Sequence, residues 1–153
     1  MTKIPSSPWP SFTQEEVESV SRVLLSNKVN YWTGDECQSF ETEFAKLVGV
    51  KYAIAVANGT VALDLCMISL NITPGDEILV TSRTFIASAT SIINIGAVPV
   101  FVDVNLDTQN IDPQKIVCAI TKKTKAILCV HFAGWPCDMD LIMDIAKKHN
   151  LFV

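Results

Sequence analysis

The sequence lacks the features that mark several classes of protein. It has no run of eighteen apolar residues, and its first ten residues, MTKIPSSPWP, contain no apolar signal-peptide core. It also has no basic patch with interleaved aromatic residues, and 16 acidic against 12 basic side chains give a net charge of -4. We therefore expect a cytoplasmic protein that binds neither nucleic acid nor membrane.

The five cysteines lack the spacing of a metal or redox motif. No two of them are arranged as C-x-x-C, and neither of the two histidines completes a zinc-binding pattern. Cys66 falls in a helical pattern and Cys129 in an apolar strand pattern. We interpret the cysteines as small buried apolar residues in a reducing compartment, and we expect no metal site.

Glycine is scarce, with six in 153 residues, and the pattern G-x-G-x-x-G is absent. A dinucleotide-binding fold of the Rossmann type needs this pattern between a strand and a helix, with an acidic residue about twenty positions later. The turn that begins at Asn58 reads NGTVAL and contains one glycine. An NAD-binding function is therefore a disfavoured alternative.

Apolar residues make up 49% of the chain, which is enough to form the core of one domain. The Pro- and Ser-rich residues 1–11 predict an extended arm, and residues 12–153 predict a single domain. This division is an expectation from composition and pattern.

Two helices are predicted near the N-terminus. Thr13 and Glu16 form a T-x-x-E capping box at the start of the first helix, which ends near Asn27. The second helix ends at about Leu47, before Gly49. Val17, Val20 and Leu24 line one face of the first helix, and Phe40, Phe44 and Leu47 are expected to face inward on the second.

From Tyr52 onward, short apolar strands alternate with helices. The predicted strands are residues 52–57, 77–80, 98–104 and 125–130, and LFV at 151–153 has the look of a strand that has just begun. The helices between them are predicted to begin at the NGT turn, at Ser88, at Pro113 and near Leu141. The alternation predicts an α/β fold with a mainly parallel sheet and helices on both faces. Because an open apolar edge is unfavourable, LFV suggests either a fragment or a covered edge.

The carboxyl ends of the strands are the ligand-binding edge of such a sheet. This arrangement places NGT (58–60), TSRTF (81–85) and HFAGW (131–135) along one rim. Asn58-Gly59 is usually a hairpin signal, but the residues after it have helical spacing, so the chain turns from strand directly into helix. The free N–H groups at the start of that helix suit an anion.

Several sequence blocks, taken in order, resemble one protein family. The blocks are WTGDECQSFETEFAKLVGVKYAIAV, NGTVALDL, PGDEILVTSRTFIASATSI, GAVPVFVDVNLDTQNIDP, TKKTKAILCVHFAGWPCDMDLI and AKKHNLFV. From about Pro10 to Val153 they resemble the DegT/StrS-type sugar aminotransferases, which use pyridoxal 5'-phosphate (PLP) and have the aspartate aminotransferase fold (fold-type I). The resemblance implies the N-terminal part of the large PLP-binding domain, incomplete at its C-terminus.

The resemblance implies that the anion is the phosphate of PLP. Gly59 and Thr60 match the family's phosphate-binding pair, and Phe85 matches the aromatic residue that stacks on the pyridine ring. Two simpler interpretations remain. Thr60 can cap a helix with no ligand present, and Phe85 can be a plain core residue.

The resemblance also implies a sugar-nucleotide pocket near Trp32 and Thr33. His131, at the end of a strand, is expected to touch substrate or cofactor. The alternatives are that Trp32 only packs and that His131 only bonds to the backbone.

The family's chemistry needs residues that this chain lacks. It uses a Schiff-base lysine and an aspartate that holds the pyridine nitrogen protonated, and none of the lysines here lies in the family's lysine motif. We therefore predict no catalytic residue in this chain.

The implied function is that of the N-terminal cofactor-binding portion of an aminotransferase in polysaccharide or amino-sugar biosynthesis. The family transfers an amino group, usually from glutamate, to a nucleotide-linked keto-sugar and works as a homodimer. The alternative is a truncated or split-gene product with no catalytic activity of its own.

Overall fold

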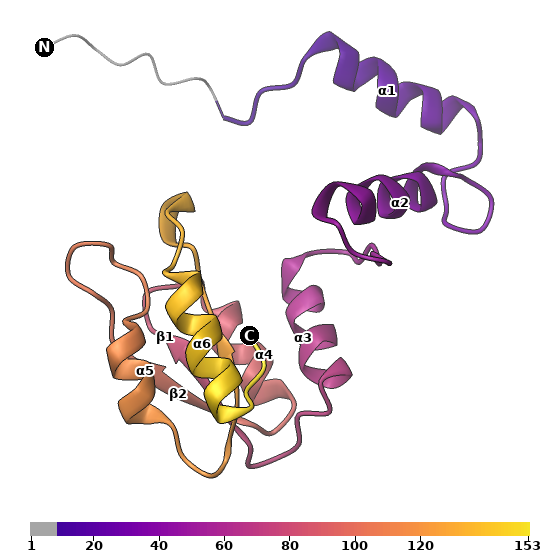
Figure 1. The fold of residues 1–153 in the computed structure, drawn as a ribbon. Coiled ribbons are helices and arrows are strands. Elements are labelled where there is room, and N and C mark those ends of the chain that lie inside the picture. Colours follow the sequence, from indigo (N-terminus) through magenta and orange to yellow (C-terminus); the bar gives the residue numbers. More distant parts are fainter. Residues whose placement is uncertain (1–8) are drawn as a thin grey trace, which may run out of the picture. The chain divides into compact units, whose positions relative to one another are not determined.

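The computed structural model describes residues 9–153 (Figure 1), so residues 1–8 of the predicted arm lie outside the described residues. The helices are α1 (Gln14–Leu25), α2 (Glu36–Val48), α3 (Gly59–Ser69), α4 (Ala87–Asn94), α5 (Pro113–Ala119) and α6 (Met139–His149). The strands are β1 (Glu77–Thr81), β2 (Val98–Val102) and β3 (Thr124–Leu128), and η1 (Phe132–Gly134) is a short 3-10 turn. The chain divides into two compact units, an N-terminal unit, Met1–Ala55, and a C-terminal unit, Val56–Val153. Within residues 9–153, the helices are too short or too polar to cross a membrane.

The N-terminal unit contains α1 and α2, and both end at signals that the sequence shows. The Glu16 N–H donates to Thr13 Oγ1 at 3.3 Å, and the Thr13 N–H donates to the Glu16 carboxylate at 2.6 Å, which completes the predicted capping box. Helix α2 ends at Gly49, whose left-handed φ of 73° lets the following N–H, that of Val50, donate to the Ala45 carbonyl at 3.0 Å. The predicted start of α1 and end of α2 are confirmed.

The apolar faces of these two helices are not buried. Among their residues that the structure describes, only Ala45 is buried. The α2 residues expected to face inward, Phe40, Phe44 and Leu47, keep between 45% and 81% of their surface exposed. Val17, Val20 and Leu24, which line one face of α1, keep between 50% and 62% exposed. The prediction is wrong because the described part of the N-terminal unit contains no sheet against which these faces can pack.

The apolar segment 52–57 forms no strand. A strand needs a neighbour to satisfy its backbone groups, and the described sheet contains only β1, β2 and β3. The Ala55 N–H donates instead to the Glu41 carboxylate at 2.8 Å. The prediction of a strand here is wrong, since an apolar pattern alone cannot supply the missing partner.

The C-terminal unit is built on a three-stranded parallel sheet of order β2-β1-β3. Strand β1 lies in the middle, with Leu79 opposite Val100 of β2 and Ile127 of β3. Ile78, Leu79 and Val80 have no exposed surface, as expected for a strand that is covered on both faces. The predicted α/β fold with a mainly parallel sheet is confirmed.

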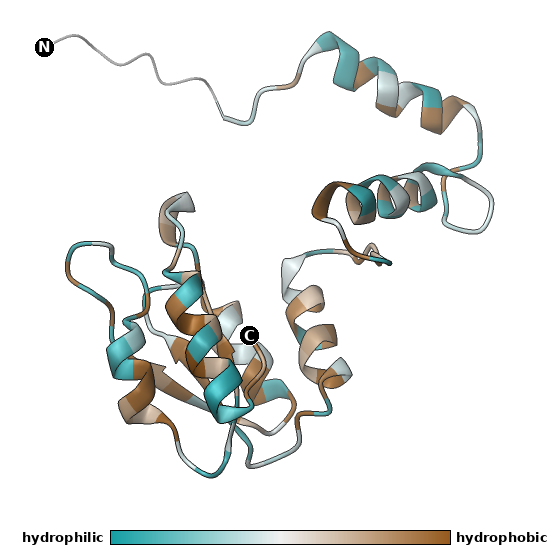
Figure 2. Cartoon of the chain, viewed as in Figure 1, coloured by the Kyte–Doolittle hydropathy of each residue, from teal (hydrophilic) through white to brown (hydrophobic). Residues whose placement is uncertain are grey.

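Two apolar clusters cover the two faces of this sheet. One contains Leu79 and buried residues of α5 and α6, and the other contains Ile78, Val80 and buried residues of α3 and α4. Successive side chains of a strand point to opposite faces, which explains this division. Figure 2 shows β1 and β2 as hydrophobic and α6 with both hydrophobic and hydrophilic bands.

The helices of the C-terminal unit begin and end at local signals. Asp112 accepts the N–H of Gln114 at 2.9 Å, and Pro113 occupies the first position of α5, as predicted. Asp138 caps α6, and the left-handed Asn150 ends it. These short-range signals set the ends of the helices.

The last residues form a bridge at the edge of β3. Phe152 pairs with Ala126 in parallel. The Ile127 N–H donates to the Phe152 carbonyl at 2.9 Å, and the Phe152 N–H donates to the Lys125 carbonyl at 3.0 Å. The prediction that LFV begins a strand is confirmed for this one residue pair.

Candidate functional site

The turn into α3 is held by Asn58. The backbone of Asn58 is extended, and its Oδ1 accepts the N–H of Val61 at 3.0 Å, so Asn58 is the N-cap. The helix begins at Gly59, and Thr60 is its second residue. The interpretation that Thr60 serves as the cap is therefore wrong.

Gly59 and Thr60 leave three donors without hydrogen-bond partners among the described residues. They are the two backbone N–H groups and the Thr60 hydroxyl, and both residues are exposed. A Cβ built on Gly59 would meet no atom within 4 Å, so no neighbouring protein group requires glycine there. Free donors beside open space fit a small anion such as a phosphate group.

The loop between β1 and α4 carries Phe85 at the carboxyl end of the sheet. The Arg83 N–H donates to the Thr81 hydroxyl at 3.1 Å, and the Thr84 and Ser88 hydroxyls share a hydrogen bond of 2.8 Å. Phe85 itself is 74% exposed. The interpretation of Phe85 as a core residue is wrong, and its ring is available for stacking.

The segment after β3 carries His131. Its Nδ1 accepts the N–H of Cys137 at 3.0 Å, and the Cys137 thiol donates to the Val130 carbonyl at 3.2 Å. The expectation of a bond to the backbone is thus confirmed for Nδ1. A neutral imidazole whose Nδ1 accepts a hydrogen bond carries its proton on Nε2, which leaves Nε2–H as a donor on an exposed residue.

Asn110, between β2 and α5, binds this segment through its side chain. Its Oδ1 accepts the Phe132 N–H at 3.0 Å, and its Nδ2 donates to the carbonyls of Trp135 and Pro136, both at 2.9 Å. Asn110 is buried, with 2% of its surface exposed. No local sequence pattern points to Asn110, because its partners lie 22 to 26 positions away.

Two loops of the rim are joined by a cation–π contact. The Arg83 guanidinium lies over the Phe132 ring, 4.3 Å from its centroid. The contact brings the loop of Phe85 next to the loop of His131, at the carboxyl ends of β1 and β3. Gly59 comes from α3, which packs against α4.

Trp32 and Thr33 belong to the N-terminal unit, in the turn between α1 and α2. The Asn30 carboxamide oxygen accepts the Trp32 N–H at 3.0 Å and the Thr33 hydroxyl at 3.2 Å. The Trp32 ring meets Tyr31 edge to face, and 89% of its surface is exposed. Trp32 is therefore not a core residue.

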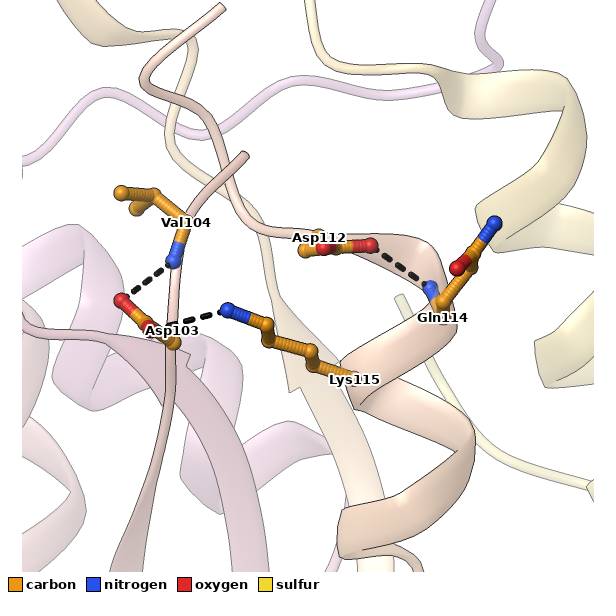
Figure 3. A network of polar contacts seen from close by, with 5 residues as sticks. All are labelled: Asp103, Val104, Asp112, Gln114 and Lys115. Carbon is orange, nitrogen blue, oxygen red and sulfur yellow. Dashed lines mark hydrogen bonds and ion pairs between the residues drawn. The ribbon is translucent and has the colours of Figure 1, made fainter. Parts of the chain in front are cut away.

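A polar network stands beyond the end of β2 (Figure 3). Lys115 Nζ donates to Asp103 Oδ2 at 2.9 Å, and the Val104 N–H donates to Asp103 Oδ1 at 2.9 Å. The hydrogen bond from Lys115 lowers the pKa of Asp103, and the same bond raises the pKa of Lys115. Lys115 is thus a protonated ammonium and not a free amine nucleophile.

The thiols near the rim are not nucleophiles. Burial raises the pKa of Cys129 to about 12, and the Cys137 thiol adds to the shift. Burial also raises the pKa of Cys137, so both groups stay protonated. Cys37, Cys66 and Cys118 are exposed, so the prediction of buried cysteines is wrong for these three and correct for Cys137.

The described residues offer hydrogen-bond donors and an aromatic ring rather than a metal site. Within residues 9–153, no group of three or more His, Cys, Asp or Glu residues is placed to hold a metal ion. One buried carboxylate oxygen in this part of the chain, Oδ1 of Asp64 in α3, has no hydrogen-bond partner. The arrangement is suited to binding and orienting an anionic aromatic ligand.

Comparison with known sequences gives a consistent set of matches. A profile of the DegT/DnrJ/EryC1/StrS aminotransferase family matches residues 10–153. The chain is 46% identical over 148 residues to GDP-perosamine synthase of Escherichia coli O157:H7. It is 44% identical over 144 residues to spore coat polysaccharide biosynthesis protein SpsC of Bacillus subtilis (strain 168). Both matches cover 94% of the chain, but the chain spans 39% and 36%, respectively, of these relatives' lengths.

Solved structures agree. An aminotransferase from Psychrobacter cryohalolentis has 64% sequence identity and a TM-score of 0.92, with 96% of this chain and 37% of that chain covered. NtdA from Bacillus subtilis with bound cofactor PMP has 34% identity and a TM-score of 0.85, with 97% of this chain and 36% of that chain covered. The predicted aminotransferase fold is confirmed over the part of these proteins that the chain spans.

Proposed function

Because the chain belongs to the DegT/DnrJ/EryC1/StrS aminotransferase family, we propose that it forms the N-terminal cofactor-binding portion of a PLP-dependent aminotransferase acting on a nucleotide-linked keto-sugar. Three similarities support the proposal: one relative is a GDP-perosamine synthase, another is a polysaccharide biosynthesis protein, and NtdA holds PMP. The complete enzyme takes its amino group from a donor such as glutamate, works as a cytoplasmic homodimer and serves polysaccharide or amino-sugar synthesis.

The observation that carries the proposal is the start of α3. The N–H groups of Gly59 and Thr60 and the Thr60 hydroxyl hold the phosphate of PLP, at the positive end of the helix dipole. The phosphate can approach the backbone because no protein atom lies within 4 Å of the position that a Gly59 Cβ would take.

Phe85 orients the cofactor by stacking on its pyridine ring. The ring of Phe85 is exposed, and the loop that carries it is tied down at two points. One is the hydrogen bond between Thr84 and Ser88, and the other is the contact of Arg83 with Phe132. A fixed loop holds the aromatic face in one orientation. When bound, PLP supplies the electron sink for amino transfer.

Residues of each unit also offer groups to the substrate. His131 donates from Nε2 to an oxygen of the substrate or cofactor, since its Nδ1 is already occupied by a backbone N–H. Trp32 and Thr33 contribute an exposed indole and a hydroxyl to the sugar-nucleotide pocket.

A chain that binds cofactor without transaminase activity of its own is the second candidate. It is favoured because no lysine here lies in the family's motif, and because the hydrogen bond to Asp103 raises the pKa of Lys115. Such a chain works with a partner that carries the lysine and the aspartate. Borohydride reduction with PLP, followed by mass spectrometry, is expected to label no single lysine. Stoichiometric labelling of one lysine contradicts this candidate.

An NMR titration of the 15N-labelled chain with PLP and with inorganic phosphate tests the proposed function. The amide signals of Gly59 and Thr60 are expected to shift with both ligands. Thr60→Val should weaken PLP binding about 10- to 150-fold, because a hydrogen bond to a charged group is worth about 1.5–3 kcal/mol.

The matched control is Thr42→Val, which removes an exposed helical hydroxyl whose bond goes to the Gln38 carbonyl of α2. This variant should bind PLP with unchanged affinity. An unchanged PLP affinity in a folded Thr60→Val chain contradicts the proposed phosphate site.

A further inference from the structure

We infer that Asn110 is a positioning residue of the rim: its side-chain amide fixes the loop from His131 to Cys137 so that His131 presents an Nε2–H donor to an acceptor oxygen of the ligand. The inference rests on the proposed function for the identity of that ligand. The hydrogen bonds that hold the loop all lie within the C-terminal unit.

Asn110 projects from a segment that is itself held in place. Val104 and Ile111 form an antiparallel bridge that closes this segment. The Asn110 carbonyl accepts the N–H of Asn105 at 2.9 Å, and the Asn110 N–H donates to the Thr108 hydroxyl at 3.3 Å. Because both the carbonyl and the N–H of Asn110 are hydrogen-bonded, its main chain is held in place and so is the point from which its side chain extends.

The side-chain amide of Asn110 uses its full donor capacity on the loop. Its two N–H groups reach the carbonyls of Trp135 and Pro136, and its oxygen accepts the N–H of Phe132. Leaving the buried amide of Asn110 without these partners would be unfavourable, and this keeps the loop in one conformation.

The loop needs this external support because its own backbone is strained. Within η1, Ala133 has a φ of 52°, a left-handed conformation that is unfavourable for a residue other than glycine. Gly134 follows with a φ of 81°. Hydrogen bonds to Asn110 on both sides of this kink stabilise it, since Phe132 precedes the kink and Trp135 follows it.

The link from Asn110 to His131 passes through one peptide group. The Pro136 carbonyl accepts from Asn110 Nδ2, and the Cys137 N–H of the same peptide group donates to His131 Nδ1. Fixing the carbonyl therefore fixes the direction of the N–H. That N–H occupies Nδ1 and orients the imidazole, so the proton of the neutral ring is on Nε2.

The test is a direct measurement of the Cys137 N–H···Nδ1 bond by NMR. In the 15N-labelled full chain at about pH 8.5, where imidazole is neutral, we expect a scalar coupling across this bond. The chain has two histidines, and His149, in the exposed last turn of α6, is the internal control without such a coupling. A folded wild-type chain that lacks the His131 coupling overturns the inference.

Asn110→Ala should abolish the coupling and make amide exchange of Cys137 about tenfold faster, as expected for the loss of one hydrogen bond. Asn110→Asp keeps the acceptor for Phe132 but loses both donors. Asn110→Asp should also abolish the coupling while the Phe132 amide stays protected from exchange. If the alanine variant does not fold, the aspartate variant alone tests the inference. Asn94→Ala, at the exposed end of α4, is the matched control and should retain the coupling.

Persistence of the coupling in either folded Asn110 variant overturns the inference. The outcome is separable from the proposed function. A wild-type chain that shows the coupling but binds no PLP contradicts the cofactor site and leaves the role of Asn110 in place.

Discussion

Gly59 begins α3 and Gly49 ends α2, but the left-handed backbone that favours glycine is found at Gly49. Gly59→Ala should leave the free energy of unfolding within about 0.5 kcal/mol of wild type, because its added methyl group meets no protein atom within 4 Å. The same methyl enters the space proposed for the phosphate, so PLP affinity measured by titration should fall.

Gly49→Ala is the contrasting variant. Its left-handed φ of 73° should make alanine cost about 1–2 kcal/mol in chemical denaturation, with PLP affinity unchanged. If Gly59→Ala bound PLP as tightly as wild type, the close approach of the phosphate to this backbone would be ruled out.

The thiol of Cys129 should resist alkylation in the folded chain. Burial holds its pKa at about 12, so at about pH 8.5 almost none of it is thiolate, the reactive form. Iodoacetamide followed by peptide mass analysis should modify the exposed Cys66 and leave Cys129 unmodified until denaturant is added. Equal modification of the two residues before denaturation would contradict the burial.

The same pKa shift predicts a pH dependence of stability. The pKa of Cys129 is raised from its ordinary 9.0 to about 12, so the folded state binds the thiol proton more tightly than the unfolded state does. Its contribution is fully present below about pH 9 and is lost as the pH rises toward 12. Denaturation midpoints should therefore fall across this alkaline range, and Cys129→Ala should reduce the fall.

At the scale of elements, different residues at the start of α3 are assigned to helix capping and to ligand binding: Asn58 caps the helix, and Thr60 is proposed to bind the phosphate. Asn58→Ala should lower the free energy of unfolding by about 0.5–2 kcal/mol, since it removes the side chain that binds the Val61 N–H. Thr60→Val should change stability little, because Thr60 lies inside the helix. Thermal melts of the two apo variants compare these effects. A larger loss for Thr60→Val would restore Thr60 as the cap.

Helix ends were predictable from sequence because their causes are local. The Thr13 capping box and Pro113 act within a few residues of their helix starts. The segment 52–57 and the apolar face of α2 were mispredicted for one shared reason. A strand or an apolar face is stabilised by what lies next to it, and the described residues beside these elements supply no sheet.

In the candidate site, too, some residues could be predicted from the sequence and others could not. The proposed positions of Gly59, Phe85 and His131 followed from strand ends and from family resemblance, and the structure brings the loops of Phe85 and His131 into contact. Asn110 was missed because nothing in its local sequence reveals bonds to a loop more than twenty positions away. Hydrogen bonds between a buried side-chain amide and a distant loop form only in the tertiary structure.

At the scale of the whole molecule, the two units differ in what they bury. Both apolar clusters consist of residues of the C-terminal unit, whereas Ala45 is the buried apolar residue described in the N-terminal unit. A fragment of residues 56–153 should therefore keep its sheet, with the amides of Ile78, Leu79 and Val80 protected from exchange. A fragment of residues 9–55 should unfold without a cooperative transition.

Overlaid 15N–1H spectra of residues 56–153 and of the full chain measure this outcome. Loss of amide protection in β1 of the shorter fragment would show that the N-terminal unit is needed to form the sheet. The single domain predicted for residues 12–153 would then describe the cooperative unit better than the two compact units do.

The sheet order also determines when β1 can pair with its neighbours during protein synthesis. Strand β1 leaves the ribosome before either of its neighbours, yet it occupies the middle of the sheet. Its backbone pairs on one side once β2 emerges, and on the other only when translation has passed Leu128 of β3. Until then the nascent chain displays Ile78, Leu79 and Val80, the residues that the finished sheet conceals completely. A chaperone that binds extended apolar segments therefore has a binding site here until β3 has paired with β1 and α6 has covered Leu79.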